Sequence, residues 1–225
     1  MEKIKGFTMN YYQDITLLPD AEANLGFLWH KVYQQIHLAL VENKVAEHSS
    51  AIGLSIPEYN SKADAKAFPL GQKIRLFAKE QAQLERLNLN SWLKRFLDYA
   101  HITSIKAVPD KVDKFVCFSR KQVKGKARIE KDITRSAQHQ STKFNLPYEE
   151  CVNTLRKRPK ASFQEEKLPF ITVTSLSSGE GDNGAKNKFR LFIVMKKATK
   201  ESTGTFNCYG LSSQSVEENA SVPWF

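Results

Sequence analysis

His37 is the residue in this sequence best suited to proton transfer near neutral pH. It lies in the segment KVYQQIHLAL, residues 31–40. An apolar row at helical spacing runs beside it: Leu28, Val32, Ile36 and Leu40. This spacing predicts an amphipathic helix. Imidazole has an unperturbed pKa of about 6.5 and can act as a general base. A histidine beside an apolar row is, however, more often a structural residue.

Metal-dependent chemistry has little support. The carboxylates are scattered, and Glu149 and Glu150 fit the first turn of a helix that begins at Pro147. His30 and His37 are seven residues apart and can share a helix face, but a zinc site needs further ligands. We therefore predict no metal and no cofactor.

Other catalytic motifs are also missing from the sequence. The chain has no GxSxG elbow, and the glycine-rich segment GEGDNGAKNK lacks the GK[ST] of a P-loop. The three cysteines, Cys117, Cys151 and Cys208, are too widely spaced for a CxxC site and odd in number. What remains is one histidine, hydroxyl groups at strand ends and a basic surface.

RNA cleavage is a reaction that one histidine, a few hydroxyl groups and a basic surface can perform. The ribose 2′-OH lies next to the scissile phosphate, so a base that removes its proton permits intramolecular attack when the geometry is fixed. The products are a 2′,3′-cyclic phosphate and a 5′-OH, and the reaction requires no metal.

Charge is unevenly divided along the chain. The net charge is +10; residues 1–110 hold 13 basic and 12 acidic residues, whereas residues 111–225 hold 21 and 12. A strongly basic half most often faces a polyanion, and nucleic acid is the first candidate. A solvated basic surface without a partner is the alternative.

The sequence shows no membrane or secretion signal. No apolar run approaches the roughly 18 residues of a membrane helix, and MEKIKGFTMNYYQD lacks the apolar region of a signal peptide. We therefore predict a cytoplasmic protein with reduced cysteines and no membrane partner.

Residues 1–110 are predicted to form a ferredoxin-like, RRM-like domain in an α+β protein. The expected order is βαββαβ. Strands are predicted at 11–18, 51–57, 73–78 and 102–108, and helices at 27–42, 80–88 and 92–99, with Asn90 or Ser91 as the cap between the last two.

Residues 111–225 are predicted to form a basic α+β domain; the family resemblance given below implies that it binds RNA and completes the active site. Extended segments are expected at 115–118, 168–178, 188–197 and 205–212, and helices at 128–139 and 147–157. Arg128, Lys131 and Arg135 recur at i, i+3 and i+7, so they share a helix face. That face could follow a phosphate backbone or be simply solvated.

Several motifs occur in an order that resembles a known family. They are YYQDITLLPD, IHLAL with IGLSIPEY, SRKQVK, LPFITVTSLSS, KFRLFI, TFNCYGLS and the terminal VPWF. Together they resemble the precursor-CRISPR-RNA processing endoribonuclease of type I-F CRISPR systems, the Csy-type member of the repeat-cleaving family. The resemblance spans nearly the whole chain and depends on the order of the motifs.

The resemblance implies a metal-independent endoribonuclease. It would cut CRISPR repeat hairpins at the base of the stem and stay bound to the mature crRNA with the other subunits of an interference complex. By position, His37 would be the general base, Ser175 would hold the ribose and its 2′-OH, and Tyr209 would orient the imidazole.

The resemblance also implies a set of RNA contacts. Phe189 would stack on a base at the foot of the stem, with Ser177 as a neighbouring contact. Arg120 and Gln122 would read base edges in the groove. The phosphates would be followed by Arg128, Lys131 and Arg135.

The sequence departs from the family pattern in places. MEKIKGFT precedes a second methionine, Met9, and the loops GEGDNGAKNK and SSQSVEENAS are expanded. The stretch after IHLAL is longer than usual, so a register with Tyr33 or His30 at the catalytic position stays open, although the residues around His37 fit best.

Simpler interpretations also stay open. Ser175 and Ser177 can be plain strand-end hydroxyls, and Tyr209 and Phe189 can be core aromatics. The principal functional alternative is a non-catalytic hairpin-binding subunit of a CRISPR ribonucleoprotein in which His37 is structural. A third is an assembly subunit whose nuclease site has decayed.

Overall fold

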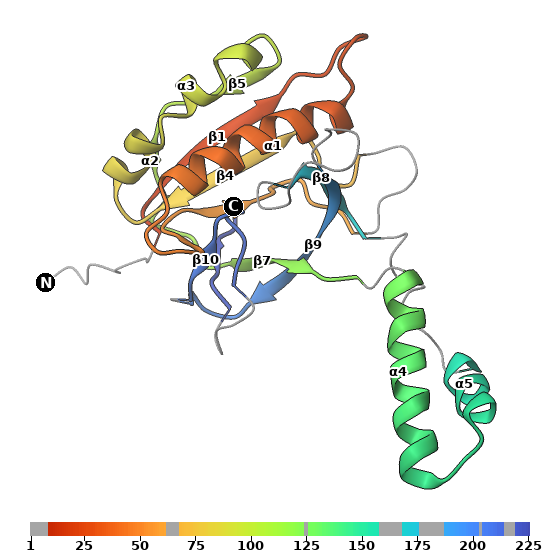
Figure 1. Cartoon of the computed structure of the whole chain (residues 1–225). Helices are drawn as coiled ribbons and strands as arrows, with labels where there is room; N and C mark the ends of the chain where they lie inside the picture. The colour runs from red at the N-terminus through yellow and green to blue at the C-terminus, as the bar shows by residue number, and fades with distance from the viewer. Residues whose placement is uncertain are drawn as a thin grey trace, which may run out of the picture. The chain divides into compact units, whose positions relative to one another are not determined.

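Helices and antiparallel sheets make up this α+β protein (Figure 1). A computed structural model describes residues 9–61, 68–123, 126–157, 168–175, 187–202, 204–213 and 219–225. In these ranges no helix is long and apolar enough to span a bilayer. The expected α+β class is confirmed at this level.

The first sheet holds the strands predicted in the N-terminal half. Its strands follow the order β3-β4-β1-β5, all antiparallel, and β6 also pairs with β1. The bounds are β1 Tyr11–Leu17, β3 Gly53–Ser55, β4 Lys73–Ala78, β5 Ala100–Ile102 and β6 Lys106–Ala107. The strand predicted at 102–108 is therefore two short strands, because β1 pairs with β5 at one end and with β6 at the other.

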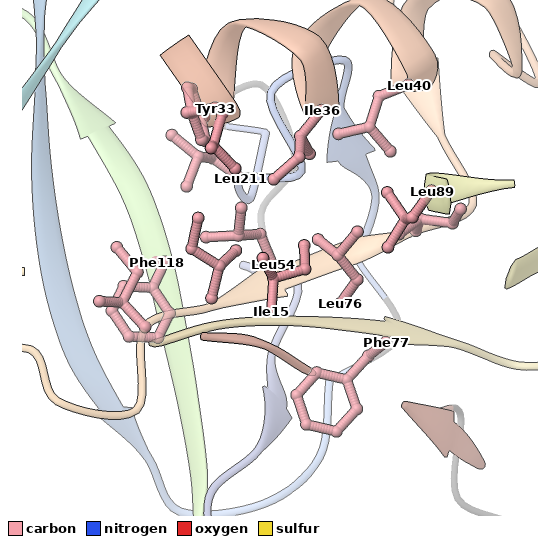
Figure 2. Close-up of a cluster of buried hydrophobic side chains, with 14 of the residues drawn as sticks. Ile15, Tyr33, Ile36, Leu40, Leu54, Leu76, Phe77, Leu89, Phe118 and Leu211 are labelled. Carbon is pink, nitrogen blue, oxygen red and sulfur yellow. The ribbon is translucent and has the colours of Figure 1, made fainter. Parts of the chain in front are cut away.

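One long helix covers this sheet. α1, Leu25–Glu42, begins at Asn24, whose side chain accepts a hydrogen bond from the Phe27 N–H. Its apolar row packs against buried residues of β1, β3 and β4, as Figure 2 shows for Ile36 and Leu40 above Ile15 and Leu54. The row predicted from the sequence is thus the face that α1 buries.

The second helical region is shorter and more broken than predicted. It consists of α2 Gln81–Leu87, α3 Leu89–Trp92 and the 3-10 helix η1 Lys94–Phe96. The break falls at Asn88, which adopts a left-handed conformation at φ 47°, rather than at Asn90 or Ser91. Asparagine tolerates this conformation better than most residues, so it can end one helix and start the next.

The second sheet comes from the C-terminal half, in the order β11-β7-β9-β8. Its bounds are β7 Phe115–Lys121, β8 Phe170–Thr174, β9 Lys188–Ala198 and β11 Val222–Pro223. The strand predicted at 188–197 is confirmed as β9, but its burial does not alternate strictly, because Phe192 is buried as well as Leu191 and Ile193. Leu191 and Ile193 belong to the same core as the buried side chains of the first sheet.

A small third pairing joins the two halves of the sequence. β2 Ser49–Ser50 pairs with β10 Phe206–Asn207. The segment predicted as extended at 205–212 is therefore a strand for only two residues, after which the chain turns. This turn carries Cys208 and Tyr209.

The described chain divides by its contacts into two compact units. The larger holds Met1–Lys121 and Pro169–Phe225, and the smaller holds Gln122–Leu168. The domain boundary predicted between residues 110 and 111 does not coincide with these units. It rests on the change in charge along the chain and on the expected roles of the two halves. It stays a prediction about function.

The smaller unit is a pair of helices, α4 Lys126–Phe144 and α5 Tyr148–Lys157. Ile133 and Ala137 of α4 are buried against Cys151 and Val152 of α5. α4 begins two residues before and ends five residues after the predicted 128–139. The predicted basic row is exposed: Arg128, Lys131 and Arg135.

A buried ion pair lies on β1 and β4. Arg75 donates from Nε and Nη2 to the two Asp14 carboxylate oxygens, at 2.6 and 2.9 Å, and from Nη1 to the Phe225 main-chain oxygen at 2.9 Å. Its guanidinium lies 4.6 Å from the Tyr12 ring centroid and 4.2 Å from that of Phe225. Arg75 therefore links the first sheet to the C-terminal segment.

Replacing Asp14 by alanine should destabilise the larger unit by about 3–5 kcal/mol, because it leaves the buried Arg75 charge without its carboxylate. Urea unfolding followed by tryptophan fluorescence measures this loss. Asp113→Ala removes an exposed carboxylate of the same unit and should change the unfolding free energy by less than about 0.5 kcal/mol. Equal stability of the Asp14 variant and the wild type would contradict this role.

Candidate active site

His37 lies on α1 with only 5% of its surface exposed. Its Nδ1 is 2.8 Å from the carbonyl oxygen of Cys208. A carbonyl oxygen only accepts hydrogen bonds, so Nδ1 carries the hydrogen and donates it. The neutral ring then keeps its lone pair on Nε2. This is the tautomer in which Nε2 can accept a proton.

Burial lowers the pKa of His37 below the ordinary histidine value of 6.5, and the hydrogen bond to the Cys208 carbonyl partly opposes that effect. Burial acts this way because it disfavours the charged imidazolium. The net direction keeps the ring neutral near pH 7, which is the form that a general base requires.

Three other side chains predicted from the sequence form a series of contacts that begins at this ring. Tyr209 stacks on His37, with ring centroids 4.2 Å apart and planes 11° from parallel. Phe189 of β9 meets Tyr209 edge-on at 6.5 Å, and the Arg120 guanidinium of β7 lies 5.3 Å from the Phe189 centroid. The structure therefore joins residues from α1, the turn after β10, β9 and β7 in one cluster.

The cluster also affects the Tyr209 hydroxyl. Burial raises the pKa of Tyr209, and the positive charge of Arg120 partly lowers it again. Tyr209 is therefore a neutral phenol at pH 7, and its flat ring covers one side of the imidazole.

The turn that carries Tyr209 has a fixed shape. The Asn207 side-chain oxygen accepts hydrogen bonds from the N–H groups of Tyr209 and Leu211, at 2.9 and 3.3 Å. Gly210 has φ +71°, and a Cβ there would lie 2.8 Å from the Leu54 Cβ. Its carbonyl accepts the Leu54 N–H at 2.7 Å. A residue with a side chain would therefore be strained at this position.

Tyr33 ties the same turn to α1. Its hydroxyl donates to the Tyr209 carbonyl at 2.9 Å, and the residue is fully buried. Burial raises the pKa of Tyr33 well above its ordinary value. The Tyr33 hydroxyl therefore keeps its proton. The hydrogen bonds from Tyr33 to the Tyr209 carbonyl and from His37 to the Cys208 carbonyl fix two successive carbonyl groups of the turn.

Ser175 follows the last residue of β8. Its N–H donates to the Asn187 carbonyl at 2.8 Å, which continues the pairing of β8 with β9. The preceding Thr174 is hydrogen-bonded through its backbone to Gln34 of α1, one helical turn from His37. Ser177 lies outside the described residues.

The remaining predicted RNA contacts belong to the smaller unit, which is described by itself. Gln122 is exposed. On α4 the basic row is exposed too, and Arg128 pairs with Asp132 at 3.4 Å. Among described residues, no group of three or more His, Cys, Asp or Glu side chains is placed to hold a metal ion.

Sequence reasoning did not predict that Asn207, Tyr33 and Gln34 hold the cluster in place. The glycine in CYGL signals a turn, and an asparagine three residues before it fits an Asx turn. Tyr33 and Gln34 precede His37 by four and three positions, so helical spacing places them on the same side of α1. Their partners, however, lie 140 or more positions away.

Known proteins match this chain over almost its whole length. The family model described as CRISPR-associated protein (Cas_Csy4) matches residues 12–225. A protein of Escherichia coli (strain UTI89 / UPEC), named CRISPR-associated endonuclease Cas6/Csy4, is 30% identical over 96% of this chain and 100% of its own length. One of Pseudomonas aeruginosa (strain UCBPP-PA14) with the same name is 31% identical, with the same coverage. A solved structure described as "An RAMP protein binding different RNA substrates" covers 90% of this chain and 95% of its own at 12% identity, but its TM-score of 0.29 is too low to support an argument.

Replacing Tyr33 by phenylalanine should cost about 1–3 kcal/mol in unfolding free energy, because the Tyr209 carbonyl loses a donor that the buried Tyr33 side chain supplies. Tyr11→Phe, at a half-buried tyrosine of β1, should cost about 0.5 kcal/mol or less. Chemical unfolding of both variants and the wild type measures the difference. Equal free energies for the two variants would contradict the role given to the Tyr33 hydroxyl.

Proposed function

The chain belongs to the Cas_Csy4 family of CRISPR-associated proteins, and we propose that it is an endoribonuclease that cleaves CRISPR repeat hairpins in precursor crRNA. The E. coli and P. aeruginosa relatives are named endonucleases. The observation that carries the proposal is the hydrogen bond from His37 Nδ1 to the Cys208 carbonyl, because it leaves the basic lone pair on Nε2.

The proposed reaction needs one base and a fixed ribose. His37 Nε2 removes the proton of the 2′-OH, and the 2′-oxygen attacks the adjacent phosphorus. The bond from phosphorus to the 5′-oxygen breaks, which leaves a 2′,3′-cyclic phosphate and, after that oxygen gains a proton, a 5′-OH. The proposal requires no metal ion.

Two further side chains take part. Ser175 holds the ribose and its 2′-OH from the end of β8. Tyr209 limits rotation of the imidazole, since its ring stacks on that of His37 at 4.2 Å and its turn supplies the carbonyl that His37 bonds. Such preorganisation lowers the entropic cost of reaching the reactive geometry.

RNA recognition is assigned to the basic half. Phe189, only partly buried, stacks on a base at the foot of the stem, and Arg120 beside it reads base edges together with Gln122. The phosphates are followed by Arg128, Lys131 and Arg135, which are exposed. Ser177 is proposed as a further RNA contact.

We assign different functions to the nearly neutral half and the basic half of the chain. Residues 1–110 form a ferredoxin-like domain that supplies His37. The antiparallel strand order β3-β4-β1-β5, with α1 packed on the sheet, supports this assignment. Residues 111–225 bind the RNA and complete the active site. We further propose that the protein acts in the cytoplasm and keeps the mature crRNA within a type I-F interference complex.

One observation favours a non-catalytic hairpin-binding subunit as the second candidate. His37 is 5% exposed, so little of its surface is open to a substrate. A purely structural histidine would have the same hydrogen bond and the same stacked neighbour. Cleavage assays separate the two candidates.

Wild-type protein should cut a labelled type I-F repeat RNA once in excess EDTA and leave a 2′,3′-cyclic phosphate. His37→Ala should lose activity by at least about 100-fold, because general-base catalysis contributes about 10²–10⁴-fold, while it still binds the hairpin. Product-end analysis and hairpin affinity are the measurements. Tight binding without cleavage by the wild type would support the binding subunit instead.

The cleavage rate at subsaturating RNA should rise with pH and then level off, because only neutral His37 can accept the proton. Under this condition the midpoint reports the pKa of the free enzyme. Burial lowers that pKa, so the midpoint should fall on the acid side of 6.5. A rate independent of pH from 5 to 8, or a midpoint well above 6.5, would contradict His37 as the base.

A further inference from the structure

Among the residues that the structure describes, β8 is an edge strand, with a neighbouring strand on one side only. Buried backbone groups need hydrogen-bond partners, and an open edge must be covered. Here α1 supplies the partners from its side chains. His30 Nδ1 lies 2.7 Å from the Thr172 carbonyl. The Thr174 N–H donates to Gln34 Oε1 at 2.8 Å, and Gln34 Nε2 donates to the Thr174 carbonyl at 3.4 Å.

The residues that hold this edge share a helix face with the proposed base. His30, Gln34 and His37 follow one another at spacings of four and three, which places them along one side of α1. One row of side chains therefore both holds β8 and carries the imidazole.

Ser175 sits at the end of the strand that this row holds. On one side its own N–H is bonded to the Asn187 carbonyl of the sheet, and on the other side Thr174 is bonded to Gln34. The strand end is thus held from both sides. Its position along α1 is set by Gln34, one turn before His37.

We propose that Gln34, supported by His30, is a positioning residue for RNA cleavage, because it fixes the distance between Ser175 and His37. The inference rests on the proposed function, in which these two residues act on the same ribose. A displacement of about 1 Å in such a site can cost about 100-fold in rate. Gln34 itself need not touch the RNA.

Three variants test this role. Gln34→Leu keeps a similar size but removes the amide. Gln34→Glu keeps an oxygen acceptor for the Thr174 N–H, which is the shorter of the two bonds. Gln35→Leu is the matched control, because its side chain points about 100° away around the helix.

Cleavage is measured in single turnover at saturating protein, and affinity is measured with a hairpin that has a 2′-deoxy group at the cut site. Gln34→Leu should reduce the saturated rate by about 10–100-fold and leave affinity within about 2-fold, since the RNA contacts are unchanged. The Gln34→Glu variant should keep most of the wild-type rate, and the Gln35→Leu variant should cleave like the wild type. A wild-type rate for Gln34→Leu, or a loss confined to affinity, would overturn the proposal.

Combining the change with Ser175→Ala separates positioning from general damage. If Gln34 acts through Ser175, Gln34→Leu should cost much less in the Ser175→Ala background than alone. The same loss in both backgrounds would overturn the positioning role.

Hydrogen exchange of the Thr174 amide tests the tether without cleavage. This amide should be protected in the wild type and should exchange faster in Gln34→Leu, while Gln35→Leu leaves it unchanged. If the wild type cuts no hairpin, the proposed function fails and the catalytic role of Gln34 fails with it. If the wild type cuts but Thr174 exchanges equally in all variants, only the inference about Gln34 fails.

Discussion

The hydrogen bond between His37 Nδ1 and the Cys208 carbonyl determines how the site is arranged. It joins residues 171 positions apart and ties α1 to the turn after β10. The Tyr33 hydroxyl binds the next carbonyl of that turn, so the turn is held at two successive peptide groups. The Tyr209 ring stacks on His37 and meets Phe189 of β9, beside which Arg120 of β7 lies. The same bond sets the tautomer of the imidazole.

α1 contacts both sheets, which explains why it carries an apolar row on one side and polar residues on another. Its apolar row packs on the first sheet with Ile36 and Leu40 (Figure 2). A second side meets the edge of β8 and the turn, where backbone groups would otherwise lack partners. Polar residues are needed there, because a buried peptide group costs free energy unless it is hydrogen-bonded. His30, Gln34 and His37 supply those bonds, so an entirely apolar helix could not replace them.

Local patterns were enough to predict the elements that depend on periodicity. β4 has the predicted bounds, α1 begins two residues early, and β9 ends one residue later than predicted. The break at Asn88 and the turn around Gly210 were not predicted, because they depend on left-handed residues and on contacts with distant Leu54. The meeting of His37, Tyr209, Phe189 and Arg120 followed from the family resemblance rather than from spacing. Gln34 was missed, since its partner Thr174 lies 140 positions away.

A nitrogen-15 NMR spectrum of the histidine rings at pH 8 tests the proposed base most directly, with His37→Gln used to assign the His37 signals. At this pH the ring is neutral, because burial lowers its pKa below 6.5. The hydrogen bond to Cys208 predicts a protonated Nδ1 and an unprotonated Nε2. If Nε2 instead carries the proton, the lone pair points at the Cys208 carbonyl, and His37 is not placed to take a proton from RNA.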